Sequence, residues 1–308
     1  MRFSLKKSEV HHIMAIPTID QAQIIGFSAQ VHVAAQQMKA RLRDKVVVKQ
    51  MIGDHFMYDG IGDAEAVEQT GRHQPIVFQD IDHRRRKIAR RRFTLTLPID
   101  ASDVRGALMN PGSEYPAACA RSMERVFDRI VVEAMFAAVL TGRDGTTSVT
   151  FANDDGDTIN ATAGTTYEKL LETTRLFTDD EVGTDVVERM VMGISGDEAE
   201  DLMLETELTS GDFSRSYAVD KGQIVNAAGY EIVKYGGSVG NPILAVSGGV
   251  RDCFVMSTRA MCVGMSKEVS INIEKRSDLH ETVQVEVVFE MGATRTEGKL
   301  IKKFQTTD

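Results

Sequence analysis

The sequence predicts an α+β protein, and three observations lead to this prediction. Residues 113–142 have the apolar spacing of one very long helix of about 28 residues. Residues 92–100, and later 268–275 and 283–293, alternate apolar and polar side chains as antiparallel strands do. Before the first of these strands, residues 53–80 are rich in Gly, Asp and Gln, which indicates a long excursion from the body of the protein.

Length and composition exclude several classes of protein. The 308 residues allow one large or two smaller domains, and 42% hydrophobic with 26% charged residues is ordinary for a globular chain. No apolar run approaches the roughly 20 residues of a membrane span, and we expect no signal peptide. A pI of about 5.4 argues against general affinity for nucleic acid or anionic membranes. The three cysteines lie in apolar stretches without metal-ligand spacing, so we expect buried free thiols.

The first hundred residues read as an arm, a helix and two strands. Residues 1–20 carry no strong period and predict an extended arm, whereas 21–42 have helix-compatible spacing. The β-branched run in 45–53 predicts a strand, and 92–100 predicts a second. Two strands on either side of the excursion describe a long hairpin.

The next segment predicts a short helix over 100–112, ended by Pro111 and Gly112. Ser113 can cap the long helix, and Gly142 can end it. The face expected to be buried comprises Cys119, Met123, Val126, Phe127, Ile130, Ala134, Ala137 and Ala138.

Further elements follow a turn-rich stretch that begins at residue 143. We expect a helix over 166–182, a strand over 187–195, a helix after Ser195, and short strands up to 262. A turn around Arg276–Leu279 joins the two late alternating strands.

No group of residues predicts catalysis. The pair His11–His12, the acidic turn 153–157 and the glycines of 235–241 each lack the spacing of a metal, calcium or phosphate site. We therefore expect no enzymatic activity, no cofactor and no metal.

Positive charge is concentrated in one short segment of an otherwise acidic chain. Seven of the nine residues from Arg84 to Arg92 are Arg or Lys, yet the net charge is −9, so the rest of the chain carries about −16. These cations could neutralise phosphates, could meet carboxylates of a neighbouring chain, or could form a solvated charged run. Few aromatic residues accompany them and the rest of the chain is acidic, which favours the second interpretation. The residues proposed for intersubunit contact are Arg84, Arg85, Arg86, Arg90, Arg91, Arg92, Asp179, Asp180, Glu181, Asp197 and Glu198.

The order of these parts resembles the major capsid protein of tailed bacteriophages, with the Hong-Kong-97-type fold. Local stretches add to the resemblance, and they are "AAQQMKARLRDKV", "GRHQPIVFQDIDHRRRKI", "DASDVRGALMNPGSEYPAACARSMERVFDRIVVEAMFAAVLTG", "LMLETELTSGDF" and "DKGQIVNAAGYEIVKY". The resemblance implies an N-terminal arm (1–45), an E-loop hairpin (46–100), a spine helix with the start of the P-domain (101–160), an A-domain (161–262) and C-terminal P-domain strands (263–308).

The resemblance also implies a function. The protein would be a major capsid subunit that packs into pentamers and hexamers of an icosahedral head around double-stranded DNA. Its partners would be other copies of itself, with separate scaffolding, portal and decoration proteins, non-specific contact with packaged DNA and no membrane. Its location would be the virion capsid, assembled in the host bacterial cytoplasm. The alternatives are a nucleic-acid-binding protein that uses residues 84–92 and an encapsulin-like compartment shell.

Overall fold

The computed structural model describes residues 39–62, 83–99, 111–160, 164–183, 188–205, 219–220, 223–224, 226–236, 242–279 and 282–307, with isolated positions between 64 and 81. The chain divides into two compact units. The smaller unit consists of Met1–Gln36, Leu95–Cys119 and Ile271–Val287, and the larger consists of Gln37–Thr94, Ala120–Ser270 and Val288–Asp308.

The larger unit contains a mixed seven-stranded sheet. Its strands are β7 (Asp157–Ile159), β8 (Met190–Ile194), β11 (Asn226–Ala227), β12 (Tyr230–Lys234), β13 (Val246–Ser247), β14 (Val250–Ser257) and β17 (Ile301–Thr307). They run in the order β11-β12-β8-β14-β17-β7, and β13 pairs with β14. β8 is parallel to β12 and antiparallel to β14, while β17 is antiparallel to β14 and parallel to β7. All five residues of β8 are buried, as expected of a strand covered on both faces.

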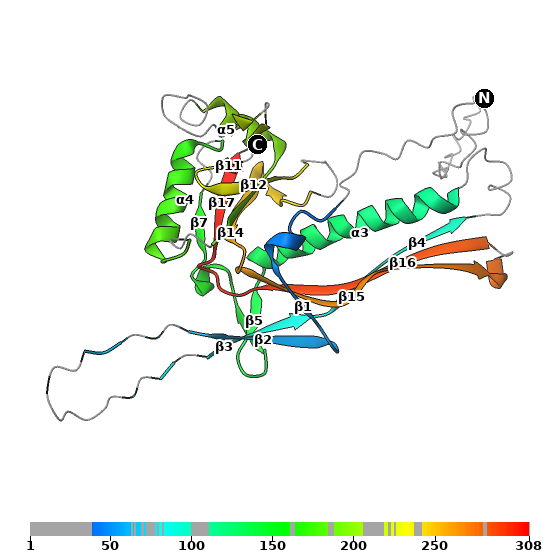
Figure 1. Cartoon of the computed structure of the whole chain (residues 1–308), viewed down its shortest axis with the longest axis horizontal. Helices are drawn as coiled ribbons and strands as arrows, with labels where there is room; N and C mark the ends of the chain where they lie inside the picture. Colours follow the sequence, from blue (N-terminus) through cyan, green and yellow to red (C-terminus); the bar gives the residue numbers. More distant parts are fainter. Residues whose placement is uncertain are drawn as a thin grey trace, which may run out of the picture. The chain divides into compact units, whose positions relative to one another are not determined.

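Two helices of the larger unit confirm the sequence predictions. α4 (Tyr167–Asp179) contacts β7 and β17, beside which Figure 1 draws it. α5 (Gly196–Leu204) begins at a capping box, in which the Ser195 hydroxyl accepts a hydrogen bond from the Asp197 N–H at 3.3 Å. The Glu198 carboxylate in turn accepts the Ser195 N–H at 2.9 Å. The cap therefore satisfies backbone donors that the first turn of a helix leaves free.

A four-stranded sheet has the order β1-β15-β16-β4. Its members are β1 (Val47–Gln50), β15 (Met261–Arg276), β16 (Thr282–Arg295) and β4 (Arg91–Ile99). The strands predicted over 45–53, over 92–100 and near the C-terminus are confirmed, but the prediction that the first two pair with each other is wrong. β1 and β4 occupy opposite edges of the sheet, since β1 pairs in parallel with β15 and β4 follows β16 in the strand order. Local alternation predicts a strand without predicting its partner.

The start of the excursion and the residues that follow it form a hairpin in a second four-stranded sheet. β2 (His55–Ile61) pairs antiparallel with β3 (His83–Ala89), and β3 continues to β5 (Val139–Thr141) and β6 (Thr147–Val149). Met51, Ile88 and Cys262 form one buried apolar cluster. This cluster joins the base of the hairpin to β15.

The long helix α3 (Pro111–Phe136) has 26 residues, so it is about 39 Å long. It begins before Ser113 and ends before Gly142, so both predicted ends are wrong. Residues Val139–Thr141 form β5 instead, because they have partners in β3 and β6, and Gly142 follows with φ +94° at the next turn. Tertiary pairing overrides the helical pattern there.

The predicted buried face of α3 is largely confirmed. Cys119, Met123, Phe127 and Ile130 are at most 3% exposed. Val126 and Ala134 are half-buried, whereas Ala137 and Ala138 lie beyond the helix and are exposed. The helix therefore packs through its middle and later turns.

The described part of the smaller unit consists of the ends of β4 and β15, the turn η3 (Ser277–Leu279), and the starts of β16 and α3. The turn η3 follows β15, as predicted, and Arg276 binds Asp278 at 2.8 Å and Gln284 at 3.0 Å. The predicted arm 1–20, nearly all of helix 21–42 and residues 100–110 of the short helix lie outside the described residues. The remaining short elements are η1 (Arg43–Lys45), η2 (Ala152–Asp154), β9 (Val219–Asp220) and β10 (Gln223–Ile224), all in the larger unit.

Candidate subunit-interaction surface

The basic run, residues 84–92, fills most of β3 and the start of β4. Successive side chains of a strand lie on opposite faces, so Arg84 and Arg86 share one face and Arg85 and Lys87 the other. Arg86 is 4% exposed, whereas Arg84 and Arg85 keep partly exposed side chains. The run therefore places cations in two different environments.

The arginines of the run form ion pairs within the chain. The pairs on the exposed side are Arg84–Glu297 (3.9 Å), Arg85–Asp59 (2.5 Å), Arg90–Asp54 (2.5 Å), Arg90–Glu290 (3.3 Å), Arg91–Glu133 (3.1 Å) and Arg92–Glu290 (3.6 Å). The hydrogen bond from Arg85 lowers the pKa of Asp59. Each of these arginines thus has a carboxylate nearby, which argues against a free cationic stripe for nucleic acid. The side chains of Arg85, Arg91 and Arg92 remain 41%, 49% and 61% exposed, so they can also reach a neighbour.

Arg86 belongs instead to a buried charged group. Its Nη2 donates to Asp154 Oδ1 at 2.5 Å, and Arg295 Nε donates to Asp154 Oδ2 at 2.7 Å. Arg295 is completely buried and also donates to the carbonyl oxygens of Ala137 and Val149. Burial lowers the pKa of the Arg295 guanidinium, and the hydrogen bond to Asp154 opposes this effect. Sequence reasoning missed this group, because Asp154 and Arg295 are far from the basic run along the chain.

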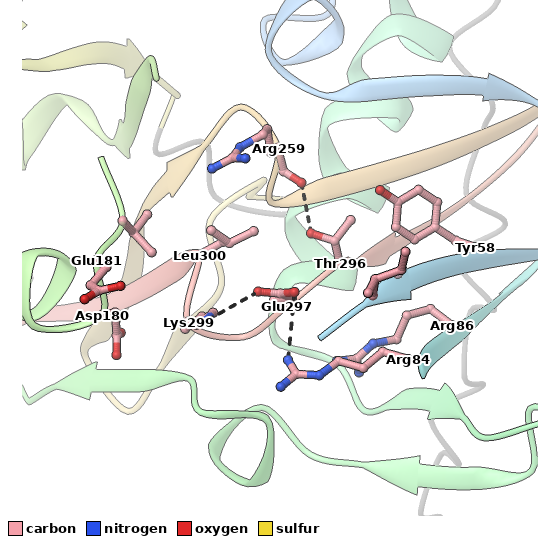
Figure 2. Close-up of a pocket in the computed structure, with 13 residues that line it drawn as sticks. Tyr58, Arg84, Arg86, Asp180, Glu181, Arg259, Thr296, Glu297, Lys299 and Leu300 are labelled. Atoms are coloured by element: carbon pink, nitrogen blue, oxygen red, sulfur yellow. Dashed lines mark hydrogen bonds and ion pairs between the residues drawn. The ribbon is translucent and has the colours of Figure 1, made fainter. Parts of the chain in front are cut away.

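A pocket of about 440 Å³ lies beside Arg86 (Figure 2). The hairpin contributes Tyr58, Arg84 and Arg86, and the side chains of the two arginines run next to each other in Figure 2. The turn after β16 contributes Glu297 and Lys299, which lie 4.0 Å apart. The pocket is therefore cationic on its hairpin side.

The opposite wall of this pocket carries other charges. It includes Asp180 and Glu181 from the turn after α4, and Arg259 from the turn after β14. Asp180 binds the buried ammonium of Lys302, and Arg259 binds Glu188 at 2.8 Å. Burial raises the pKa of Glu188, but hydrogen bonds from neighbouring hydroxyl, guanidinium and backbone donors outweigh burial, so the pKa is lowered.

The remaining acidic candidates lie at the ends of α4 and α5. Asp179 pairs with Arg175 at 2.7 Å on the surface of α4. Asp197 is exposed and lies 3.5 Å from Arg251, whereas Glu198 is 2% exposed and binds Arg251 at 3.1 Å. Arg86 and Glu198 are thus buried and paired inside one chain, so we leave them out of the proposal that exposed ion pairs join subunits. The other nine candidates stay in it.

The first described residues are fixed to α3 by two acids one turn apart. Asp128 is fully buried, and its carboxylate accepts the Arg41 N–H at 2.9 Å and the Leu42 N–H at 3.1 Å. Glu124 accepts the Ala40 N–H at 3.1 Å. These contacts anchor the chain where it leaves the predicted N-terminal arm. The one sequence signal is an acid, Asp128, between apolar residues of the long helix.

Other kinds of site have little support in the described part of the chain. Its acidic, histidine and cysteine side chains form no group of three or more that could hold a metal ion. Among its helices, none is both long and apolar enough for a membrane span. Cys119, Cys253 and Cys262 are free and buried, as predicted.

Comparison with known proteins decides the family. The family described as "Phage capsid protein" matches residues 19–303. The chain belongs to this family. It is a major capsid protein of a phage virion, so that sequence prediction is confirmed, and neither alternative function is favoured.

Solved capsid structures show the same fold at low sequence identity. The capsid protein of the cyanophage P-SCSP1u has a TM-score of 0.68 and 12% identity, with 94% of each chain covered. That of the Helicobacter pylori bacteriophage KHP30 has a TM-score of 0.69 and 10% identity, with 97% of this chain and all of that chain covered. The capsid of a native GTA particle has a TM-score of 0.59 and 11% identity, with 96% and 100% covered. No curated protein sequence matches the chain.

The predicted Hong-Kong-97-type α+β fold is thereby confirmed. A capsid protein acts in many copies, so self-association is part of its function, and the family indicates a structural, non-enzymatic role.

Proposed function

We propose that this capsid protein packs into pentamers and hexamers of an icosahedral head that encloses double-stranded DNA, and that the head assembles in the host bacterial cytoplasm. The observation that carries the proposal is the hairpin excursion. From the last residue of β2 onward it leaves large apolar side chains in water, with Ile61 70%, Val67 62% and Phe78 91% exposed. A run of such side chains on one excursion is best explained by a neighbouring subunit that covers them.

We further propose that the parts keep the roles implied by the resemblance. Residues 1–45 would be the N-terminal arm, 46–100 the E-loop, 101–160 the spine helix with the start of the P-domain, 161–262 the A-domain and 263–308 the C-terminal P-domain strands. Strand pairing crosses two of the boundaries between these parts. β1, from the proposed E-loop, lies in one sheet with β15, β16 and β4. β17, from the proposed C-terminal P-domain strands, lies in the seven-stranded sheet.

Partners other than the chain itself are proposed from the resemblance alone. Scaffolding, portal and decoration proteins would be separate chains. Packaged DNA would touch the inner surface through non-specific contacts, and no membrane would take part.

The exposed arginines of the basic run would contact carboxylates of adjacent copies. The candidates are Arg84, Arg85, Arg90, Arg91, Arg92, Asp179, Asp180, Glu181 and Asp197. Exposed ion pairs are individually weak, but a shell repeats each contact at every equivalent interface. Assembly should therefore weaken as salt screens these charges.

The test replaces Arg85, Arg91 and Arg92 by Gln. The triple variant should melt as the wild type does, because the three side chains are exposed. It should form few capsomers or shells in sedimentation, and wild-type assembly should proceed without DNA. A matched control replaces three exposed arginines elsewhere, Arg175, Arg189 and Arg276, by Gln.

Normal shells from the first variant would refute the role of these arginines. Normal shells combined with lost DNA affinity and a reduced salt slope would instead support nucleic-acid binding by the basic run.

A further inference from the structure

The buried group around Asp154 has more positive than negative charge. One carboxylate accepts hydrogen bonds from two guanidinium groups, Arg86 and Arg295, which are 4% and 0% exposed. Arg295 satisfies its other nitrogens with backbone carbonyl oxygens. Burying a charge without an opposite charge nearby is strongly unfavourable. The group as it stands in one chain is therefore incomplete.

Arg86 is the member with free donors. Its Nε and Nη1 are buried and have no hydrogen-bond partner among the described residues. Arg86 also lines the 440 Å³ pocket, next to Arg84, which forms a long ion pair of 3.9 Å with Glu297. A planar guanidinium with two free N–H groups fits an oxyanion such as a carboxylate.

We propose that this pocket binds a carboxylate side chain of a second copy of the chain, which Arg86 and Arg84 hold in the assembled particle. The inference rests on the proposed assembly. Two observations favour a carboxylate over a phosphate. The opposite wall carries Asp180 and Glu181, which repel a multiply charged anion more strongly than a single carboxylate. Each copy carries net charge −9, so its neighbours offer many acids.

The position of the pocket would let a bound carboxylate connect two copies of the chain. It lies between the hairpin base, the turn after α4 and the turn after β16, all in the larger unit. A carboxylate bound there would connect the hairpin base of one copy to its neighbour. The contact would complete the buried charged group only when the particle forms.

The test compares stability and assembly of Arg86→Gln. In the free subunit Asp154 keeps Arg295, and one uncompensated charge is removed, so the melting temperature should be unchanged or higher. The concentration needed for assembly should rise at least about tenfold, because a buried ion pair between copies is lost. Arg84→Gln, at the partly exposed edge of the pocket, should raise it in the same direction without affecting folding. Arg175→Gln, an exposed pair on α4, serves as the control with wild-type assembly.

Anion probes separate the possible occupants. Sodium acetate should raise the melting temperature of the free wild-type subunit by roughly 1–3 °C over sodium chloride at equal ionic strength. It should leave Arg86→Gln unaffected and should inhibit wild-type assembly. Inorganic phosphate that stabilises the wild type more than acetate would overturn the proposal in favour of a phosphate site.

The remaining outcomes also decide the question. If Arg86→Gln melts lower than wild type and Arg84→Gln assembles normally, the role is structural within one chain and the proposal is wrong. If both variants assemble at wild-type concentrations, the proposal is wrong while the capsid function stands. If the wild type forms no particles under any condition, the proposed assembly itself fails.

Discussion

The anchor between Asp128 and residues 41–42 yields a quantitative prediction. Replacing Asp128 by Ala leaves the partly buried N–H of Arg41 and the buried N–H of Leu42 without the carboxylate that accepts them at 2.9 and 3.1 Å. A hydrogen bond to a charged group contributes about 1.5–3 kcal/mol, so two donors imply a loss of about 3–6 kcal/mol in the free energy of unfolding. At roughly 2 °C per kcal/mol in a chain of this size, the melting temperature should fall by about 6–12 °C.

The assay is urea unfolding of the free subunit, followed by circular dichroism. Glu133→Ala is the matched control on the same helix, because the Glu133 side chain is 54% exposed and its pair with Arg91 should contribute less than about 1 kcal/mol. Equal small losses for the two variants would refute the argument that Asp128 fixes the start of the chain to α3.

Four further predictions follow from single buried groups. Ile130→Asp places a charge at a site 2% exposed on α3, so soluble protein should be lost, and a folded variant with unchanged melting temperature would show that the helix face is wrong. Tyr235→Phe removes a buried hydroxyl without a described partner, so the melting temperature should hold or rise, and a clear fall would reveal a partner. Burial raises the pKa of the Cys262 thiol to about 11, so thiol reagents at pH 8 should label it only after denaturation, and fast labelling of the native subunit would contradict its burial. The folded-state pKa of Glu188 is below its ordinary value, so the ionised carboxylate stabilises the fold above about pH 4.5, and this stabilisation is lost at lower pH. Glu188→Gln should therefore flatten the acid side of the curve of stability against pH. An unchanged curve would count against a contribution of Glu188 to the pH dependence of stability.

The sequence predicted the individual helices and strands better than it predicted which strands pair with each other. Periodicity located β4, α4, β8 and α5, and the capping residues located the start of α5, because these signals depend on neighbouring residues. The pairing of β1 with β15 joins segments more than 200 residues apart, so no local pattern contains it. The end of α3 was misplaced for the same reason, since Val139–Thr141 leave the helix to pair with β3 and β6.

For the basic run, too, the sequence predicted the local feature but not its tertiary contacts. Its composition predicted a surface that meets acid, and each of its arginines does meet a carboxylate. Composition could not show that alternation in β3 turns Arg86 inward to Asp154, or that Arg295 shares that carboxylate. Those facts depend on the packing of the hairpin against the C-terminal strands.

Electron microscopy of the purified protein tests the central claim most directly. The full-length chain is expressed alone, purified and brought to low salt, and particles are imaged and classified by diameter. We predict closed shells of uniform diameter, built from pentamers and hexamers and formed without added DNA. A protein that stays monomeric across concentration, salt and added scaffolding protein would contradict the account.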